Sequence, residues 1–265
     1  MSRICYANAE RSSPPEFDDA RRVFIFNETI AIFTLGAALH RKHTACLCLG
    51  QFLGFRIRHF CGFNYFEPMT ESPLNVLAVA GSLHRKSITR IVINHIAEKL
   101  RAEGCAVDVL DLQTEPLPMY NPDTSYDMPE FVALQKRVDK ADVLILGTPD
   151  YHGSISSTLK NFLDHFWHEF AGKLFVTVVA SHEKGLTATD QLRTVARQCY
   201  AWTLPYGISF AENTDLKDGQ VAGGAFEKRL EMMIRDARVY GSLIAHQRRT
   251  DLKTQDHCFM ARHRK

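Results

Sequence analysis

NVLAVAGSLHRKS, residues 75–87, indicates the type of fold more clearly than any other segment of this chain. An apolar run from Val76 to Ala80 stops abruptly at Gly81, and a helical pattern begins near Ile88. This order predicts a buried strand, a tight turn and the start of a helix. Because the N-terminus of a helix carries unpaired N–H groups and partial positive charge, the turn is predicted to bind a phosphate-bearing ligand.

Side chains in and just after this turn could add donors to the same anion. They are Ser82, His84, Arg85, Ser87 and Thr89. The turn lacks both the G-x-G-x-x-G pattern of dinucleotide-binding loops and the Gly-Lys-Ser/Thr ending of nucleoside triphosphate-binding loops. A phosphate monoester held by hydroxyls and one or two cations suits it better. The alternative is an ordinary polar turn in which Ser87 caps the helix.

Residues 70–245 alternate apolar runs with helical patterns. Strands are expected at 76–80, 107–110, 143–147, 174–180 and near 202–210, and helices at 88–103, 129–140, 157–170, 187–200 and 224–245. This alternation predicts an α/β domain with a five-stranded parallel sheet and right-handed connections. Ligands of such sheets bind beyond the carboxyl ends of the strands, where the loops at 81, 148 and 181 are expected to converge.

A second polar constellation, TPDYHGSIS at Thr148–Ser156, follows the third expected strand. Pro149 and Gly153 shape a turn that is expected to expose backbone N–H groups. Tyr151 and His152 add aromatic surface beside it. A planar heteroaromatic ring needs this pairing of flat apolar contact on one face and donors along an edge. The alternative is a surface loop that caps the following helix.

Composition narrows the class of protein. The chain has 265 residues, of which 45% are hydrophobic and 23% charged, as in globular domains. Residues 69–245 carry 18 Lys and Arg against 22 Asp and Glu, which argues against nucleic acid as the main partner. The seven cysteines form no even-numbered framework in this central region, so a reduced, cytoplasmic setting without disulfides is expected.

The two ends of the chain differ from its centre. Residues 1–68 keep no structural period, and Met69 resembles an ordinary bacterial start, so we expect an N-terminal extension from a misplaced start codon, outside the fold. A targeting or membrane-anchoring segment and an extra subdomain are the alternatives, although the apolar stretch Val23–Leu39 is short for a membrane span and contains Glu28. Residues 246–265 are predicted to be a disordered basic tail, with a nucleic-acid arm as the alternative.

Metal binding is not expected. A site could be imagined in the N-terminal segment, but the C-x-C spacing and the lack of a paired C-x-x-C do not favour it. Its members would be His40, His43, Cys46, Cys48, His59 and Cys61. An aromatic run has helical spacing, which predicts packing in the core or at an interface; it comprises Phe162, Phe166, Trp167 and Phe170.

Three motifs together resemble the NADPH-dependent FMN reductase family, over about residues 74–245. They are Gly81-Ser82-Leu-x-x-x-Ser87, then Thr148-Pro-x-Tyr151-x-Gly-Ser, then Leu159-Lys160-Asn161-x-Leu-Asp164. This family comprises flavodoxin-like enzymes that include FMN, quinone, chromate and azo-dye reductases. The resemblance implies a flavodoxin-like three-layer fold, a five-stranded parallel sheet in the order 2-1-3-4-5, and an FMN-binding domain over residues 69–245.

The resemblance also implies a set of cofactor-binding residues. Ser82, His84, Ser87 and Thr89 would hold the FMN phosphate, and Pro149, Asp150, Tyr151, His152 and Gly153 would line the isoalloxazine. Arg85, Ser154 and Ser181 complete the expected set. The chain departs from the family where Asp150 and His152 replace the usual Glu and Asn, where Ser156 replaces a common Pro, and where Ser181–Gly185 lacks the usual glycines. That third loop usually meets the far edge of the flavin.

The resemblance implies an NAD(P)H-dependent flavin oxidoreductase. FMN would pass electrons by hydride transfer from NADPH (or NADH) to free flavin, a quinone or a similar small-molecule electron acceptor. Hydride transfer needs no side-chain acid or base, so no catalytic residue is expected. The implied assembly is a homodimer or homotetramer in which a second subunit completes the flavin site, with no nucleic-acid or membrane partner. The alternatives are a flavodoxin-type electron carrier and a non-catalytic FMN-binding regulatory protein.

Overall fold

A computed structural model describes residues 73–221 and 223–264, together with two short strands, β1 (Ile25–Phe26) and β2 (Thr29–Ile30), which pair antiparallel. The chain divides into two units, Met1–Pro68 and Met69–Lys265. The division coincides with the expected start of the domain. The candidate metal ligands at 40–61 lie outside the described residues, as does most of the segment 1–68. The candidate metal site and the proposed origin of that segment therefore stay predictions.

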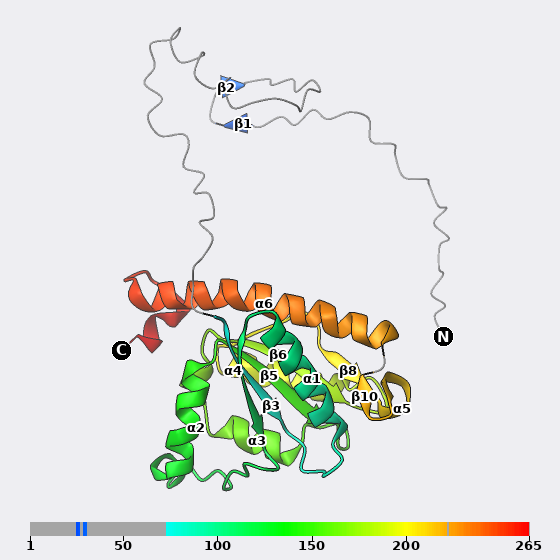
Figure 1. Cartoon of the computed structure of the whole chain (residues 1–265). Helices are drawn as coiled ribbons and strands as arrows, with labels where there is room; N and C mark the ends of the chain where they lie inside the picture. The colour runs from blue at the N-terminus through cyan, green and yellow to red at the C-terminus, as the bar shows by residue number, and fades with distance from the viewer. Residues whose placement is uncertain (1–24, 27–28, 31–72, 222, 265) are drawn as a thin grey trace, which may run out of the picture. The chain divides into compact units, whose positions relative to one another are not determined.

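The second unit is built on a parallel sheet in the order β4-β3-β5-β6-β7, with β8 also paired to β6 (Figure 1). The strands are β3 (Asn75–Ala80), β4 (Ala106–Asp111), β5 (Val143–Pro149), β6 (Leu174–Ala180), β7 (Trp202–Thr203) and β8 (Ile208–Phe210). In order of appearance along this unit, the sheet reads 2-1-3-4-5. The predicted flavodoxin-like topology is therefore confirmed.

Helices cover both faces of this sheet. One face carries α1 (Ile88–Ala102) and α6 (Gly224–Lys253), and the other carries α2 (Pro129–Lys140), α3 (Ser157–Asp164) and α4 (Leu186–Gln198) (Figure 1). Short elements complete the unit: η1 (Ser125–Asp127), η2 (His168–Phe170), α5 (Glu212–Asp215), β9 (Leu216–Lys217), β10 (Gln220–Val221) and η3 (Phe259–His263). Among the described residues, no helix is both long and apolar enough to cross a membrane.

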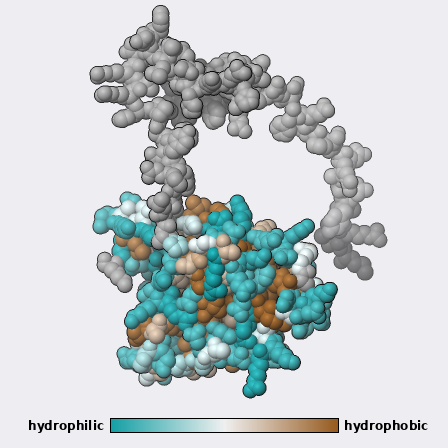
Figure 2. Space-filling model, viewed as in Figure 1, coloured by the Kyte–Doolittle hydropathy of each residue, from teal (hydrophilic) through white to brown (hydrophobic). Residues whose placement is uncertain are grey.

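The burial of β3 explains its unbroken apolar sequence. Val76, Ala78 and Ala80 pack in the core beneath α1 and α6, whereas Leu77 and Val79 pack on the opposite side with α2, α3 and α4. Both faces of the strand are thus removed from water, as in most parallel sheets. The solvent-facing surface of the domain is mostly hydrophilic in the view of Figure 2, with hydrophobic patches between the polar side chains.

The last expected strand differs from the prediction. Instead of one strand near Trp202–Phe210, the chain forms β7 and β8, separated by Leu204–Gly207. Pro205 lies in this gap and has no N–H with which to continue the ladder. Both short strands still pair with β6, so the sheet keeps its topology.

The third helix is shorter than expected, because α3 ends at Asp164 rather than Phe170. The His165 Nδ1 atom lies 2.7 Å from the carbonyl oxygen of Asn161, which a continuing α-helix would use for the next backbone hydrogen bond. Phe162, Phe166 and Phe170 are buried in the core, whereas Trp167 is 52% exposed. Core packing is therefore confirmed for the three phenylalanines of this aromatic run and not for Trp167.

The prediction of a disordered tail over residues 246–265 is wrong up to Arg264. Helix α6 continues to Lys253, and η3 follows it. Met260 is buried, and the Phe259 ring contacts Trp202 at the sheet edge. The Arg248 Nε donates to the carbonyl of Ala171 at 2.9 Å. The many basic residues of this segment suggested an unfolded tail, but one of them, Arg248, instead bonds a backbone carbonyl within the fold.

Lys173, just before β6, is an unusual buried cation with only 1% of its surface exposed. Its Nζ donates to the carbonyl oxygens of Val138 and Asp139, the latter at 3.0 Å, at the C-terminal end of α2. Burial, with a smaller contribution from Arg248, lowers the pKa of the Lys173 ammonium from its usual 10.5 to about 7. The charge of this side chain therefore changes near neutral pH.

We expect Lys173 to make stability depend on pH. Between about pH 7 and 10.5 the unfolded chain holds the Lys173 proton more tightly than the folded chain, so the free energy of unfolding rises with pH in this window. Lys173→Met removes this term. The difference in unfolding free energy between wild type and variant, measured by urea titration, should therefore rise across the window. Parallel curves for the two proteins would contradict the assignment.

Candidate functional site

The turn after β3 contacts β5 through two glycines, Gly81 just past the end of β3 and Gly147 within β5. The Gly81 N–H donates to the Gly147 carbonyl at 2.8 Å. The Gly81 carbonyl in turn accepts from Ser156 Oγ at 2.5 Å and Thr158 Oγ1 at 2.8 Å. A Cβ at Gly81 would lie only 2.7 Å from the Gly147 oxygen, so no larger residue fits this approach. The two predicted polar constellations are therefore neighbours, as expected.

Residues 81–87, which we call the anion loop, lead into the N-terminus of α1. Ser87 Oγ accepts from the Arg90 N–H at 3.2 Å and so caps the helix, while its own hydroxyl hydrogen can still donate. Among the described residues, nothing accepts from the N–H groups of Ile88 and Thr89. The side chains of Ser82, Ser87 and Thr89 are buried beside these amides. This arrangement offers several donors to an anion.

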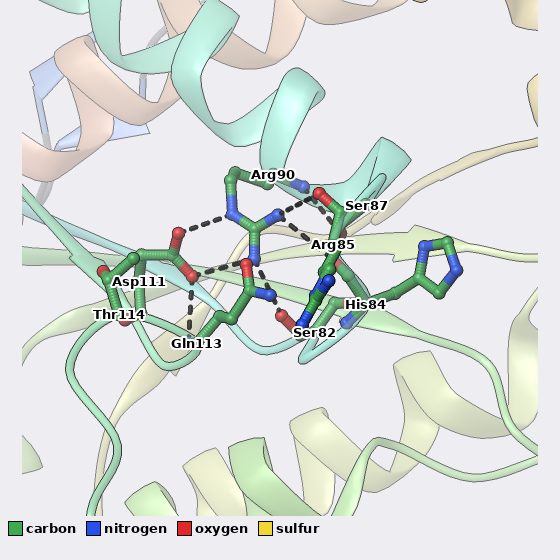
Figure 3. Close-up of polar contacts among 8 residues, drawn as sticks. All are labelled: Ser82, His84, Arg85, Ser87, Arg90, Asp111, Gln113 and Thr114. Atoms are coloured by element: carbon green, nitrogen blue, oxygen red, sulfur yellow. Dashed lines mark hydrogen bonds and ion pairs between the residues drawn. The ribbon is translucent and has the colours of Figure 1, made fainter.

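The guanidinium of Arg90, in the first turn of α1, contacts the backbone of the anion loop (Figure 3). Its Nη1 donates to the carbonyls of His84 and Arg85 at 3.1 and 3.3 Å, and its Nη2 donates to the carbonyl of Ser82 at 3.2 Å. Its Nε and Nη2 also bond the two carboxylate oxygens of Asp111, at the end of β4. Three carbonyls of the loop thus face the guanidinium.

Residues 151–154 form a tight hairpin turn beside the anion loop. Tyr151 and Ser154 exchange two backbone hydrogen bonds, of 2.9 and 3.1 Å. His152 and Gly153, the two central residues, have φ of 58° and 76°, as a type I′ turn requires. The Asp150 N–H donates to the Ala180 carbonyl. Fewer backbone donors are therefore available than expected, because within 149–154 only the N–H groups of His152 and Gly153 lack a bond among the described residues.

Asp150 carries an unsatisfied acceptor. Its Oδ2 accepts from Ser181 Oγ at 3.0 Å, which joins the turn to the loop after β6. Its Oδ1 is buried and has no hydrogen-bond partner among the described residues. Leaving a buried carboxylate oxygen unpaired costs on the order of 1–3 kcal/mol or more. A donor from a bound ligand would remove this penalty.

A cavity of about 200 Å³ lies where these loops converge. Eight of the residues expected from the sequence line it: Ser82, His84, Ser87, Thr89, Pro149, Asp150, Tyr151 and Ser181. Four others do not, namely Arg85, His152, Gly153 and Ser154. Ser154 instead donates its hydroxyl to Gln191 Oε1 at 3.1 Å. Whether any of these residues holds a cofactor stays a prediction.

Several lining residues were not anticipated. They are Lys86, Ile88, Ala180, His182, Ala211 and Glu212. Ala211 and Glu212 follow β8, so the rule that ligands bind beyond strand carboxyl ends would have found them. The pairing of Arg90 with a carboxylate could also have been predicted from the sequence. A cation in the first turn of a helix is unfavourable beside the positive end of the helix dipole, so a nearby carboxylate is expected to compensate it.

The Leu159–Asp164 motif has a structural role in this chain. Asn161 Oδ1 accepts from the Tyr120 N–H at 2.7 Å, and its Nδ2 donates to the Pro118 carbonyl at 2.9 Å. These bonds fix the proline-punctuated loop after β4 to α3. Lys160 pairs with Asp164 one turn further along the same helix. Asn161 therefore holds this loop in place. The motif has this structural role, and none of its residues lines the cavity.

Comparison with known proteins gives a consistent result. Residues 74–215 match the family model described as NADPH-dependent FMN reductase. An NADH-dependent FMN reductase of Pseudomonas putida is 28% identical over 169 residues, covering 61% of this chain and 89% of that protein. An NADPH azoreductase of Bacillus sp. (strain OY1-2) is 26% identical over 174 residues, covering 64% of this chain and 94% of that protein.

Solved structures share the fold at low sequence identity. An oxidoreductase from Corynebacterium diphtheriae superposes with a TM-score of 0.54 at 18% identity, covering 66% of this chain and 99% of that one. The apo form of an NADH:FMN oxidoreductase gives 0.51 at 19% identity, covering 63% and 89%. These similarities support the same arrangement of strands and helices in the fold.

Gly81→Ala tests the contact between the two loops. The added Cβ would meet the Gly147 oxygen at 2.7 Å and Leu159 Cβ at 2.8 Å, so the free energy of unfolding should fall by roughly 1–3 kcal/mol. Ser157→Ala, at an exposed residue of α3, is the control, because it adds no atom to a packed region. Chemical denaturation measures both variants. Equal stabilities would show that the approach at Gly81 is not constrained.

Proposed function

Because the chain belongs to the NADPH-dependent FMN reductase family, we propose that it uses FMN to pass electrons from NAD(P)H to free flavin, a quinone or a similar small acceptor. The observation that supports this most directly is the cavity at the carboxyl ends of β3 and β5, with a donor-rich helix N-terminus on one side and an aromatic turn on the other. A phosphorylated, planar cofactor needs both.

The residues of the cavity fit FMN. The hydroxyls of Ser82, Ser87 and Thr89, with the free N–H groups at the start of α1, would hold the phosphate. Pro149 and Tyr151 would contact the ring system. The flavin ring has an N–H and the ribityl chain has hydroxyls, and either could donate to the unpaired Oδ1 of Asp150. The orphaned acceptor thus matches a group that the cofactor carries.

The chemistry divides between cofactor and protein. When bound, FMN supplies the hydride chemistry, and the chain supplies binding and orientation. The N–H groups of His152 and Gly153 lie outside the cavity lining, at the tip of the hairpin turn, and would be donors to a ring edge that projects from the cavity, where they would stabilise negative charge. No acid or base is required from the protein. If donor and acceptor use the same face of the ring in turn, the kinetics are ping-pong.

We also infer that a second copy of the chain completes the site, as a homodimer or homotetramer. A cavity of about 200 Å³ is smaller than the roughly 300–1,000 Å³ typical of cofactor sites. Tyr151, which lines it, is 52% exposed. A partner subunit would enclose the part of the cofactor that projects from the cavity. Full activity in a strict monomer, measured by light scattering alongside the assay, would contradict this inference.

A cytoplasmic location is consistent with the thiols. Cys105, Cys199 and Cys258 are free, and the first two are buried. Burial raises the pKa of the Cys199 thiol to about 11, so this thiol is uncharged and unreactive at neutral pH. Free thiols of this kind are usual in reducing compartments. The domain proposed to carry the activity begins at Met69 and includes the C-terminal segment through η3.

The direct test is NADPH and NADH oxidation by the purified chain with added FMN, followed by absorbance under anaerobic conditions. We expect the flavin to bleach on mixing and to reoxidise when a quinone is added. A flavodoxin-type carrier would be reduced only after addition of a separate reductase. A regulatory protein would bind FMN without measurable turnover.

Ser82→Ala combined with Ser87→Ala should weaken FMN binding. Each hydroxyl that bonds the phosphate contributes roughly 1.5–3 kcal/mol, so the dissociation constant should rise about tenfold or more for each bond lost. Quenching of flavin fluorescence measures the affinity. Ser157→Ala, at an exposed serine of α3, is the matched control. Unchanged FMN affinity in the double variant would contradict the assignment of the phosphate site to this loop.

A further inference from the structure

We propose that Arg90 is a positioning residue of the anion loop, which sets the affinity for the phosphate of FMN without contacting it. The inference rests on the proposed function, because it concerns how the same cavity binds FMN. At first sight an arginine in the first turn of α1, next to an anion site, would be taken for a phosphate ligand. Its contacts exclude that role in this arrangement.

All the donors of the guanidinium are engaged within the protein. An arginine side chain has five N–H bonds, one on Nε and two on each Nη. Nε donates to Asp111 Oδ2, Nη1 to the His84 and Arg85 carbonyls, and Nη2 to the Ser82 carbonyl and Asp111 Oδ1 (Figure 3). Five donors therefore meet five acceptors. None is left for an anion.

The three carbonyl contacts determine the direction of the loop amides. In a planar trans peptide unit the C=O and the following N–H point in opposite directions. Drawing the carbonyls of Ser82, His84 and Arg85 toward Arg90 therefore turns the N–H groups of Leu83, Arg85 and Lys86 away from it. None of these N–H groups has an acceptor among the described residues. The loop thus presents donors on the side opposite the guanidinium and hides its carbonyls.

Asp111 fixes the guanidinium in this position. Its two carboxylate oxygens bond Nε and Nη2, and Oδ1 also accepts from the Gln113 N–H at 3.0 Å. Both side chains of the pair are only 17% exposed. The carboxylate neutralises the cation, so Arg90 contributes little net attraction for an anion. Its effect on FMN should therefore come from the conformation of the loop.

The test compares FMN with riboflavin, which lacks the phosphate, in Arg90→Gln, Asp111→Asn and the double variant. We expect each single variant to raise the dissociation constant of FMN about 10- to 100-fold and that of riboflavin by less than about twofold. The double variant should be no weaker than Arg90→Gln alone, since both changes release the same loop. Arg101→Gln, on the same helix and bonded to the Val107 carbonyl, is the matched control.

The two variants separate positioning from attraction by charge. If Arg90 acted as a phosphate ligand or by its charge, Asp111→Asn would tighten FMN binding by removing a nearby negative charge, and this result would overturn the proposal. Arg90→Lys keeps the charge but not the fork of donors, so we expect it to behave like Arg90→Gln; wild-type affinity in this variant would also overturn it. Wild-type protein that binds neither flavin would instead reject the proposed function.

Discussion

The backbone contact between Gly81 and Gly147 is the constraint on which the candidate site depends. Gly81 directly follows the last residue of β3 and Gly147 lies within the adjacent strand β5, and the hydrogen bond between them holds the turn after β3 against β5. Ser156 and Thr158 then bond the Gly81 carbonyl from the next helix. Segments about 70 residues apart in the sequence thereby form one wall of the cavity. Without that approach, a helix N-terminus and an aromatic turn would be separate surface features.

In an anion site built from backbone amides, the carbonyl oxygens must point away from the anion, because their partial negative charge would repel it. In this chain the carbonyls of Gly81, Ser82, His84 and Arg85 all accept from side chains outside the loop. The cations of the loop itself, Arg85 among them, play no part in this. The polarity of the loop therefore comes from the orientation of peptide dipoles, which an arginine and a carboxylate on neighbouring elements maintain.

The sequence predicts those features that depend on local pattern. Strand β6 and helix α2 have the bounds expected from their apolar run and their proline start, Leu174–Ala180 and Pro129–Lys140. The convergence of the loops follows from parallel topology. The features that the sequence does not predict are side-chain contacts between residues far apart in the chain. The pairing of Arg90 with Asp111 spans 21 residues, and a basic tail gave no sign that Arg248 would bond a carbonyl 77 residues away.

The long final helix has a consequence for biosynthesis. Phe226, Leu230 and Met233 of α6 cover one apolar face of a sheet whose last strand, β8, ends at Phe210. During translation every strand of this sheet therefore leaves the ribosome before α6, which covers this face together with α1. The part of this face that α6 covers therefore stays exposed to water until α6 has been synthesised, and exposed apolar surface of this kind is prone to aggregate and is bound by chaperones.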